Sequence, residues 1–373
     1  MSKIIIIGPA SPLRGGIADL NEAFANSLVK NNFEVEIISF SLQYPKFLFP
    51  GKTQYREKTY PINHYKISSI INSINPFSWI KTAKYIITQK PSKVFIRFWM
   101  PFFGPCLGYI AKKIMQKNIP VYSIVDNAIP HEIRYGDRVL TNYFLNKCVK
   151  HFSLSGKVKF DILSLNKNYN VIKLFHPIYN TFDPISTKKK ALKELNLKEG
   201  KYILFFGLIR SYKGLDLILE AMSHPKIKEQ NIKLLIAGEF YDKQENYDSL
   251  IEELNLNNII IENNFIPKNR VPYYFAVSNV LVLPYKSATQ SGVTQLSMYY
   301  ESPMIVTNVG GLPEVVDHKI NGLVVEPNSN SIAEAILYYF SDDNIEYEMN
   351  QSIKIKKNEY SWSNFTSSIL KNT

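Results

Sequence analysis

The sequence predicts an α/β protein with two doubly wound, Rossmann-like domains, each built on a parallel sheet. Three observations lead to this prediction. Short apolar runs alternate with amphipathic stretches of helical spacing from end to end. The runs are apolar at consecutive positions, which is typical of strands that helices cover on both faces. The chain has 373 residues, 45% of them hydrophobic, which suits two domains with sizeable cores.

The first domain is expected over residues 1–180. Its strands are predicted at residues 4–7, 35–39, 94–98, 121–125, 152–154 and 171–175, and its helices at 17–29, 79–87, 107–115 and 139–148. The polar stretch from Asn180 to Lys190 is typical of a linker, so the domain boundary is predicted there.

The second domain is expected over residues 181–358 and repeats the same alternation. Its strands are predicted at residues 202–206, 234–237, 259–261, 280–283, 304–306 and 322–325, and its helices at 215–222, 247–254, 293–300 and 332–340. A C-terminal segment, residues 359–373, contains a last short helix. Doubly wound sheets bind ligands at the carboxyl ends of their strands, so functional residues are expected in the loops that follow the strands.

The composition disfavours several classes of protein. Only Cys106 and Cys148 are present, so no disulfide framework holds the fold and a reducing cytosol is favoured. Met1-Ser2-Lys3 leads directly into an apolar strand, and we therefore expect no signal peptide. No segment has the ~20 consecutive apolar residues of a membrane-spanning helix.

The charge is unevenly distributed. Residues 1–180 carry 24 Lys and Arg against 9 Asp and Glu, whereas the rest of the chain carries 20 against 23. The basic half indicates an anionic partner: nucleic acid, an acidic membrane surface or a phosphorylated substrate. The alternative is a solvated, lysine-rich surface without a partner.

Two loops have glycines or cations in positions suited to an anion. Gly15 and Gly16 follow the first strand and precede a helix, whose N-terminus favours anions, although glycine pairs are also common in ordinary turns. Arg210 and Lys213 follow the first strand of the second domain. Two cations there can clamp a diphosphate, Arg as a fork and Lys as a point charge. The alternative is two solvated surface cations.

Three further loops combine polar residues. Thr289-Gln290-Ser291-Gly292 precedes a helix and forms either a phosphate site or an ordinary N-cap. Residues 310–314 place Glu314 after a glycine pair, either facing sugar hydroxyls or in the first turn of a helix. Residues 126–132 bring Asp126 and His131 into one loop, which leaves general acid–base and hydroxyl-binding roles open. No second His stands at the spacing of a zinc motif, so no metal site is expected.

Together these loops resemble those of the family 4 retaining glycosyltransferases, which have the GT-B fold. The resemblance extends over nearly the whole chain and is strongest over residues 204–326. The matching stretches are Gly15-Gly16 and residues 126–132, 207–214, 290–292 and 310–314. The resemblance implies two Rossmann-like domains with a cleft between them, and a C-terminal helix that crosses back to the first domain.

The sequence departs from the family pattern in three loops. In the first, Leu208 stands where the family often has an arginine, and Arg210 is expected to substitute for it. The paired glutamates of the family are absent, because Ala288 and Leu296 occupy their positions, and Gln290 or Gln295 is expected to replace their contacts. Asp126 stands where the family has a histidine that contacts the donor sugar.

The resemblance implies a site and a set of partners. It assigns catalysis to Arg210, Lys213, Asp126 and His131. It assigns binding of the donor, a nucleoside diphosphate sugar, to Gly15, Gly16, Arg210, Lys213, Glu239, Phe265, Ile266, Gln290, Ser291, Gly292 and Glu314. Transfer is expected to proceed with retention at the anomeric carbon, without a cofactor or a metal.

The acceptor is expected on the basic first domain, as a glycan or a lipid-linked acceptor of cell-surface polysaccharide or glycolipid synthesis. We expect a cytoplasmic protein that associates peripherally with the anionic inner face of the membrane. The aromatic and cationic segments 44–49 and 97–103 suit such a surface, with core packing as the alternative for the second.

Three other functions stay open. An epimerase of the same fold would use Asp126, His131 and Glu132 for proton abstraction. A nucleic-acid binder is suggested by the basic half, but no known nucleic-acid-binding module is visible, and no nucleic acid is expected as a partner. A catalytically inactive subunit that binds a nucleotide sugar is suggested by the missing glutamates.

Overall fold

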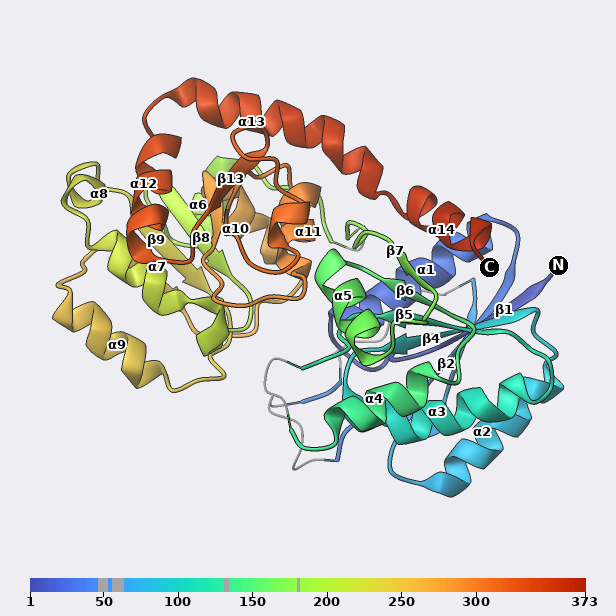
Figure 1. The fold of residues 1–373 in the computed structure, drawn as a ribbon. Helices are drawn as coiled ribbons and strands as arrows, with labels where there is room; N and C mark the ends of the chain where they lie inside the picture. Colours follow the sequence, from blue (N-terminus) through green and yellow to red (C-terminus); the bar gives the residue numbers. More distant parts are fainter. Residues whose placement is uncertain (46–52, 56–63, 131–133, 180–181) are drawn as a thin grey trace. The chain divides into compact units, whose positions relative to one another are not determined.

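The computed structural model describes residues 1–45, 53–55, 64–130, 134–179 and 182–373. The chain forms two compact units. The first consists of Met1–Pro177 and Ser361–Thr373, and the second of Ile178–Tyr360. Each unit is built around its own parallel sheet (Figure 1). The C-terminal segment therefore belongs to the first unit from Ser361 onwards.

The described strands of the first unit form one sheet in the order β3-β2-β1-β4-β5-β6-β7. These strands are β1 (Lys3–Ile7), β2 (Glu34–Leu42), β3 (Lys66–Asn72), β4 (Lys93–Phe98), β5 (Val121–Val125), β6 (Lys150–Ser153) and β7 (Val171–Lys173). The helices are α1 (Gly16–Lys30), α2 (Pro76–Thr88), α3 (Gly104–Met115), α4 (Asp137–Leu145), α5 (Gly156–Leu165) and α14 (Trp362–Lys371). Helices α2, α3 and α4 lie side by side along the sheet (Figure 1).

Helix α14 packs on α1 although more than 300 residues separate them in the sequence. The contact is both polar and aromatic. Ser27 Oγ donates a hydrogen bond to the Trp362 carbonyl over 3.2 Å, and Thr366 Oγ1 donates to Ser27 Oγ over 2.7 Å. Phe365 packs edge-on against Phe24 with ring centroids 5.8 Å apart. These contacts tie the end of the chain to the first unit.

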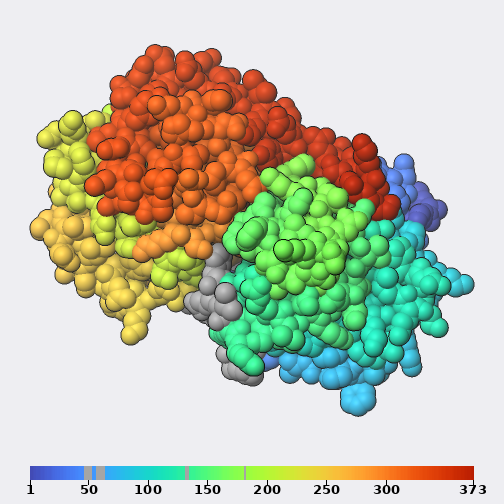
Figure 2. Space-filling model, in the orientation of Figure 1, coloured from blue at the N-terminus to red at the C-terminus, as the bar shows by residue number. Residues whose placement is uncertain are grey.

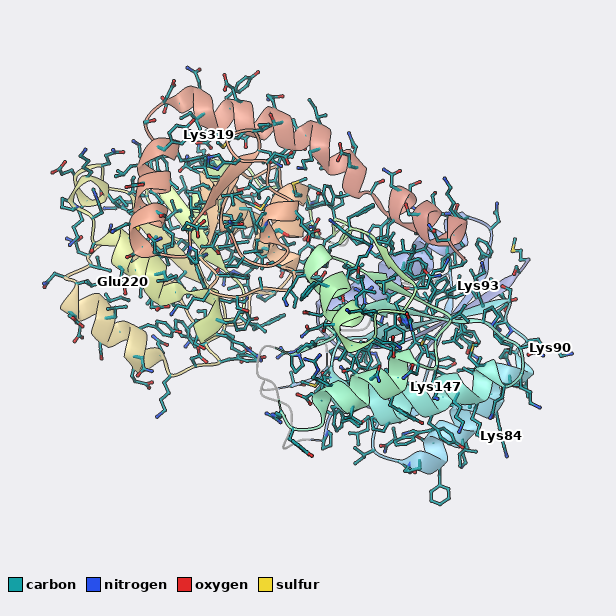
Figure 3. The ribbon with its side chains drawn as sticks, in the orientation of Figure 1. Lys84, Lys90, Lys93, Lys147, Glu220 and Lys319 are labelled. Carbon is teal, nitrogen blue, oxygen red and sulfur yellow. The ribbon has the colours of Figure 1, made fainter. Side chains whose placement is uncertain are left out.

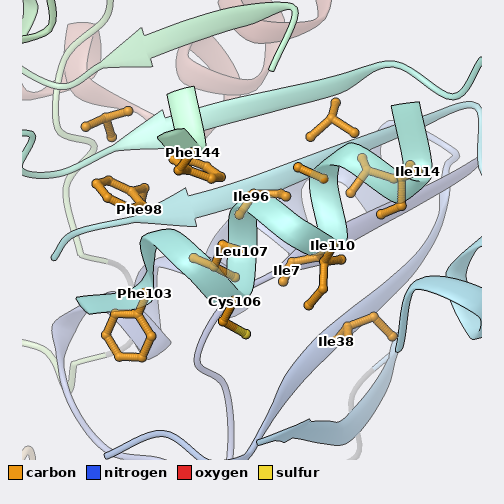
Figure 4. Close-up of a cluster of buried hydrophobic side chains, with 14 of the residues drawn as sticks. Ile7, Ile38, Ile96, Phe98, Phe103, Cys106, Leu107, Ile110, Ile114 and Phe144 are labelled. Carbon is orange, nitrogen blue, oxygen red and sulfur yellow. The ribbon is translucent and has the colours of Figure 1, made fainter. Parts of the chain in front are cut away.

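The core of the first unit lies between the sheet and the layer of α2, α3 and α4 (Figure 4). β-Branched strand residues such as Ile7 and Ile96 are fully buried, as expected for strands covered on both faces. Phe98 and Phe144 stack with ring centroids 4.5 Å apart. Burying each such side chain contributes about 1.5–3 kcal/mol, so this layer stabilises the strand ends that carry the loops.

The described strands of the second unit form a sheet in the order β10-β9-β8-β11-β12-β13. They are β8 (Tyr202–Phe206), β9 (Lys233–Ala237), β10 (Ile259–Glu262), β11 (Val280–Leu283), β12 (Met304–Thr307) and β13 (Gly322–Val325). The helices are α6 (Lys188–Glu194), α7 (Leu215–Met222), α8 (Pro225–Glu229), α9 (Gln244–Glu253), α10 (Val271–Val277), α11 (Gly292–Tyr299), α12 (Ser329–Tyr339) and α13 (Asp343–Lys356). The predicted fold class, two doubly wound parallel sheets, is confirmed.

Some elements were not expected from the sequence. β3 is an edge strand, and Ser68 and Ser69 interrupt its apolar residues, so it lacks the continuous apolar run of a central strand. Also unpredicted are α5, α6, α8, α10 and α13. Among the described residues, no helix has both the length and the apolar character required to cross a membrane.

Candidate functional site

Three loops at the carboxyl edge of the second sheet touch one another through glycines. Gly214 has a φ of +69°, and a Cβ there would lie 2.0 Å from the carbonyl oxygen of Pro284, in the loop after β11. Gly310 has a φ of +55°, and a Cβ there would lie 1.6 Å from the carbonyl oxygen of Ala288. The loops after β8, β11 and β12 therefore approach one another so closely that only glycine fits at both positions.

Lys213 lies buried among these loops, with 9% of its surface exposed. Its Nζ lies 5.5 Å from the ring centroid of Tyr285. Among the described residues it makes no ion pair with a carboxylate. Burial lowers the pKa of its ammonium, and the nearby guanidinium of Arg210 lowers it further. A buried cation of this kind is costly alone and is suited to an anionic ligand.

Arg210 is the second cation of this loop and is half-buried. Its guanidinium lies over the ring of Tyr241, 5.0 Å from the centroid. It also makes no ion pair with a carboxylate in the part of the chain that the structure describes. The loop therefore holds two neighbouring positive charges that no acidic side chain of the described residues neutralises.

The N-terminus of α11 lies beside Lys213. An ideal Cβ on Gly207 would be 3.4 Å from both Lys213 Nζ and Val293 Cγ2, so the ammonium and the first turn of α11 meet at one point. Ser291 caps this helix by accepting a hydrogen bond from the Val293 amide over 3.2 Å. The remaining amides of the first turn and the helix dipole favour an anion at the same point as the two cations.

Tyr285 connects these groups and was not singled out by the sequence. Its ring lies under Lys213 Nζ, and its hydroxyl lies 3.3 Å from Ser291 Oγ. Its carbonyl accepts a hydrogen bond from Thr307 Oγ1 over 2.6 Å. Burial raises the pKa of Tyr285 to about 12, so the ring stays neutral. Only its position, two residues after the end of β11 and thus in a loop at the carboxyl edge of the sheet, could have pointed to Tyr285 in the sequence.

The other predicted donor-binding residues of the second unit also lie in loops at the carboxyl ends of its strands. The Glu239 carbonyl accepts from the Ile209 amide over 2.9 Å, which brings the loops after β8 and β9 together. Glu239 Oε2 is buried without a hydrogen-bond partner among the described residues. Phe265 is 50% exposed after β10, and Ile266 beside it is buried.

Around α11 and β12, the structure also shows where the remaining predicted residues lie. Gln290 is half-buried directly before the Ser291 cap. Gln295 is buried inside α11, where it donates to Thr294 Oγ1 over 3.3 Å, and Thr294 Oγ1 in turn donates to the carbonyl of the N-cap Ser291 over 2.6 Å. Glu314 lies in the short 3₁₀ turn Leu312–Glu314 after β12, and its carbonyl accepts from the hydroxyl of Tyr360 over 3.1 Å.

In the first unit, Asp126 is held in a buried ion pair that the sequence did not reveal. Arg97 on β4 donates from Nε and from its second terminal nitrogen to the two carboxylate oxygens of Asp126, each over 2.5 Å. Arg97 is 1% exposed and Asp126 6%. His176 is near this pair, and burial lowers its pKa to about 4. The predicted catalytic role of Asp126 stays a prediction, and His131 lies outside the described residues.

Gly15 and Gly16 begin α1 in the first unit. Gly15 is the N-cap, with a φ of +119° and no side-chain cap, and apart from its two chain neighbours no described residue has an atom within 4 Å of the position that a Cβ would take. No group of three or more His, Cys, Asp or Glu side chains suited to a metal occurs among the described residues.

Segments 44–49 and 97–103 were predicted to form a membrane-binding surface. Arg97, Phe98, Pro101 and Phe103 are buried and Trp99 and Phe102 half-buried, so most of residues 97–103 is core, which was the alternative interpretation. Met100 is the one large apolar side chain of this segment that is exposed, at 41% of its surface. In segment 44–49, Tyr44 packs against Phe103 with ring centroids 5.2 Å apart, and residues 46–49 lie outside the described residues.

Solved structures of other proteins share the fold of this chain. Sucrose-phosphate synthase from Thermosynechococcus elongatus superposes with a TM-score of 0.77 at 16% identity, over 100% of this chain and 98% of that chain. Anabaena HepE in complex with UDP-glucose gives a TM-score of 0.73 at 15% identity, over 100% of both chains. At these identities the likeness concerns the fold, and the chain has the GT-B fold.

A family model matches the sequence of the second unit. The model of the family described as glycosyl transferases group 1 matches residues 187–360. The second unit is therefore similar in sequence to the glycosyl transferases group 1. An uncharacterized glycosyltransferase of Methanocaldococcus jannaschii is 26% identical to this chain, over 94% of it and 92% of its own length. The narrower prediction, a family 4 retaining enzyme, stays a prediction.

Proposed function

We propose that this protein transfers a sugar from a nucleoside diphosphate sugar to a glycan or lipid-linked acceptor. The observation that carries the proposal is the meeting of Arg210, Lys213 and the N-terminus of α11 at the carboxyl edge of the second sheet. Two cations without acidic partners and a helix start together suit a diphosphate. The group 1 family match over the same unit supports a sugar-nucleotide donor.

The proposed chemistry is mainly electrostatic. Negative charge grows on the diphosphate as its bond to the sugar breaks, and Arg210, Lys213 and the α11 amides stabilise that charge. A comparable preorganised donor is worth about 2.7–4 kcal/mol of transition-state stabilisation. Because these groups already offset the charge, the proposal assigns no metal to this role. We propose that transfer retains the anomeric configuration and that the departing diphosphate accepts the acceptor's proton.

Donor recognition is assigned to the neighbouring loops. The base rests near Phe265 and Ile266, and Glu239 and Glu314 bind donor hydroxyls. A carboxylate oxygen that is buried without a protein donor, as in Glu239, suits a ligand hydroxyl. UDP-glucose bound to Anabaena HepE, a protein of the same fold, is consistent with a donor of this type.

We further propose a role in cell-surface polysaccharide or glycolipid synthesis, with the protein associated peripherally with an anionic membrane. The excess of Lys and Arg in residues 1–180 supports this association. Asp126 and His131 are proposed to face the acceptor or the donor sugar, from the first unit.

The test is thermal stabilisation by UDP, GDP, ADP, CMP and NAD. One nucleoside diphosphate is expected to stabilise the protein by about 2.7 kcal/mol at 100 times its dissociation constant. The Arg210→Ala, Lys213→Ala variant should lose this effect, whereas a matched variant with Ala at Lys226 and Lys228, exposed on α8, should keep it. Absence of stabilisation by every nucleotide would reject the proposal.

One alternative has its own observation. Ala288 and Leu296 are buried where the family glutamates would stand, so this chain could bind a nucleotide sugar without transferring it. Nucleotide binding with no transfer to glycan or lipid acceptors, and no isomerised sugar nucleotide, would favour this inactive subunit. Isomerisation of the sugar without an acceptor would favour the epimerase.

A further inference from the structure

The first unit has a surface on α2 and α3 that carries cations and exposed apolar side chains. The sequence from Lys66 to Val125 contains no Asp or Glu but nine Lys and Arg. This stretch includes β3, α2, β4, α3 and β5. Figure 2 shows α2, in light blue, at the surface of the first unit.

The outward side of α2 is apolar at its start and cationic further along. Phe77, Ile80, Lys81 and Lys84 follow the spacing i, i+3, i+4 and i+7, which places them on one face of the helix. Phe77 is 75% exposed and Ile80 36%, and Ile74 just before the helix is 53% exposed. The opposite face, which includes Ala83 and Ile86, is buried in the core.

The apolar end of this face lies at the carboxyl edge of the first sheet. β3 ends at Asn72 and α2 begins at Pro76, and Trp79 Nε1 donates to the Asn72 carbonyl over 2.8 Å. Phe77 is thus at the same edge as the loops after β1 and β5, which contain Gly15 and Asp126. This is the edge proposed above to meet the acceptor.

Helix α3 extends the cationic part of the surface. The rings of Trp79 and Tyr109 lie 6.2 Å apart between the two helices. Lys112 is exposed in the last turn of α3, and Lys117 is exposed just beyond it. Figure 3 labels Lys84 on α2 and Lys90 just beyond that helix. We name this surface, formed by Phe77, Ile80, Lys81, Lys84, Lys112 and Lys117, the α2–α3 face.

The lysines of the α2–α3 face differ from other cations of the same stretch in their ion pairing. Arg97 pairs with Asp126, and Lys66 pairs with Glu36. By contrast, none of Lys81, Lys84, Lys112 and Lys117 makes an ion pair within the described residues. Their positive charge is therefore available to an external partner.

We propose that the α2–α3 face docks on an anionic lipid bilayer, with Phe77 and Ile80 in the lipid interface and the lysines at the headgroups. This inference rests on the peripheral membrane association proposed above and gives it a surface. Burial of exposed apolar side chains is favourable in the lipid interface, whereas a nucleic-acid backbone offers them no apolar surroundings. A second copy of this chain is disfavoured as the partner, because two cationic faces repel each other. Docking in this way brings the acceptor edge of the first unit to the membrane.

The experiment measures binding of the full-length chain to vesicles of phosphatidylcholine, with and without phosphatidylglycerol. The wild type should bind only the anionic vesicles and should be released when salt shortens the Debye length from about 10 Å at 0.1 M to about 3 Å at 1 M. The Lys81→Gln, Lys84→Gln variant should bind about 25-fold more weakly, at about fivefold per lysine. Phe77→Ser should bind roughly tenfold more weakly.

Matched controls lie on the second unit. The Lys226→Gln, Lys228→Gln variant removes the same charge from exposed positions, and Tyr347→Ser removes an aromatic side chain that is 65% exposed. Both should bind vesicles like the wild type. In Phe77→Trp, the fluorescence emission of the new indole should shift to shorter wavelength when anionic vesicles are added, whereas in Tyr347→Trp the vesicles should leave the indole emission unchanged.

Three results would overturn the inference: equal binding of all variants, binding to neutral vesicles that salt does not change, or lysine-dependent binding to single-stranded DNA without a shift in Phe77→Trp. Nucleotide stabilisation is measured on the same variants and should be unchanged. A protein that binds vesicles through this face but is stabilised by no nucleotide would reject the proposed function and leave this inference standing.

Discussion

Replacing Lys213 by methionine should separate the stability of the second unit from its ability to bind a nucleotide. Lys213 is 9% exposed, has no acidic partner among the described residues, and has a pKa lowered by burial. The charged form is therefore disfavoured in the folded protein. Methionine keeps most of the apolar stem without the charge. We expect the free protein to gain about 1 kcal/mol, or about 2–4 °C in Tm for a domain of this size.

The same substitution should weaken nucleotide binding. A hydrogen bond to a charged group contributes about 1.5–3 kcal/mol, which corresponds to a roughly 10- to 150-fold change in Kd. At a nucleotide concentration of about 100 times the wild-type Kd, the stabilisation should fall from about 2.7 kcal/mol to about 0.3–1.4 kcal/mol. The variant is thus more stable alone and less stabilised by its ligand.

Scanning calorimetry, with and without the nucleoside diphosphate that stabilises the wild type most, measures both effects. Lys226→Met, at an exposed position on α8, should change neither. A Lys213→Met variant that is less stable alone and retains the full nucleotide effect would refute the reasoning, because Lys213 would then support the fold rather than the ligand.

Three more predictions concern the two units. Asp126→Asn leaves the buried guanidinium of Arg97 without its counter-ion and should cost about 3–5 kcal/mol in urea unfolding; a loss below about 1 kcal/mol would contradict the ion pair's importance. Gly310→Ala should abolish nucleotide stabilisation, because its Cβ would collide with a backbone carbonyl, whereas Gly136→Ala, with a φ of +93° and open space, should keep it; equal behaviour would contradict the steric argument. Burial lowers the pKa of both His151 and His176 from 6.5 to about 4, so the unfolded chain takes up these protons first as the pH falls. Each histidine should cost the first unit about 3 kcal/mol of stability between pH 6.5 and 4. In urea unfolding followed against pH, His176→Gln should remove about half of this dependence, and an unchanged dependence would contradict the role of His176.

The sequence predicted the second unit best. Its strands are continuous apolar runs, and a central parallel strand requires such a run whatever its neighbours are. The positions of the loops that follow them could therefore be predicted from the sequence, and Arg210, Lys213 and Ser291 do lie in such loops, whereas their proposed role stays a prediction. The edge strand β3 was missed because one side of an edge strand has no neighbour, and its serines interrupt the apolar pattern.

The pairing of Arg97 with Asp126 shows a second kind of limit. Arg97 lies on β4 and Asp126 directly after the neighbouring strand β5, where Phe98 pairs with Val125. Strand order and register bring them together, and neither is written in the local sequence. The same holds for residues 97–103, whose composition fits a membrane surface and a core equally well; packing against α4 made most of it core.

By itself, the sequence determined the fold class, the loops at the carboxyl ends of the strands and the residue types within them, because these depend on local periodicity and turn chemistry. Only the tertiary structure decided that Lys213 is buried over Tyr285 without an acidic partner, and that the apolar and cationic residues of α2 face outward. Burial and charge pairing depend on contacts with residues that are distant in the sequence, so they are defined only once the chain has folded.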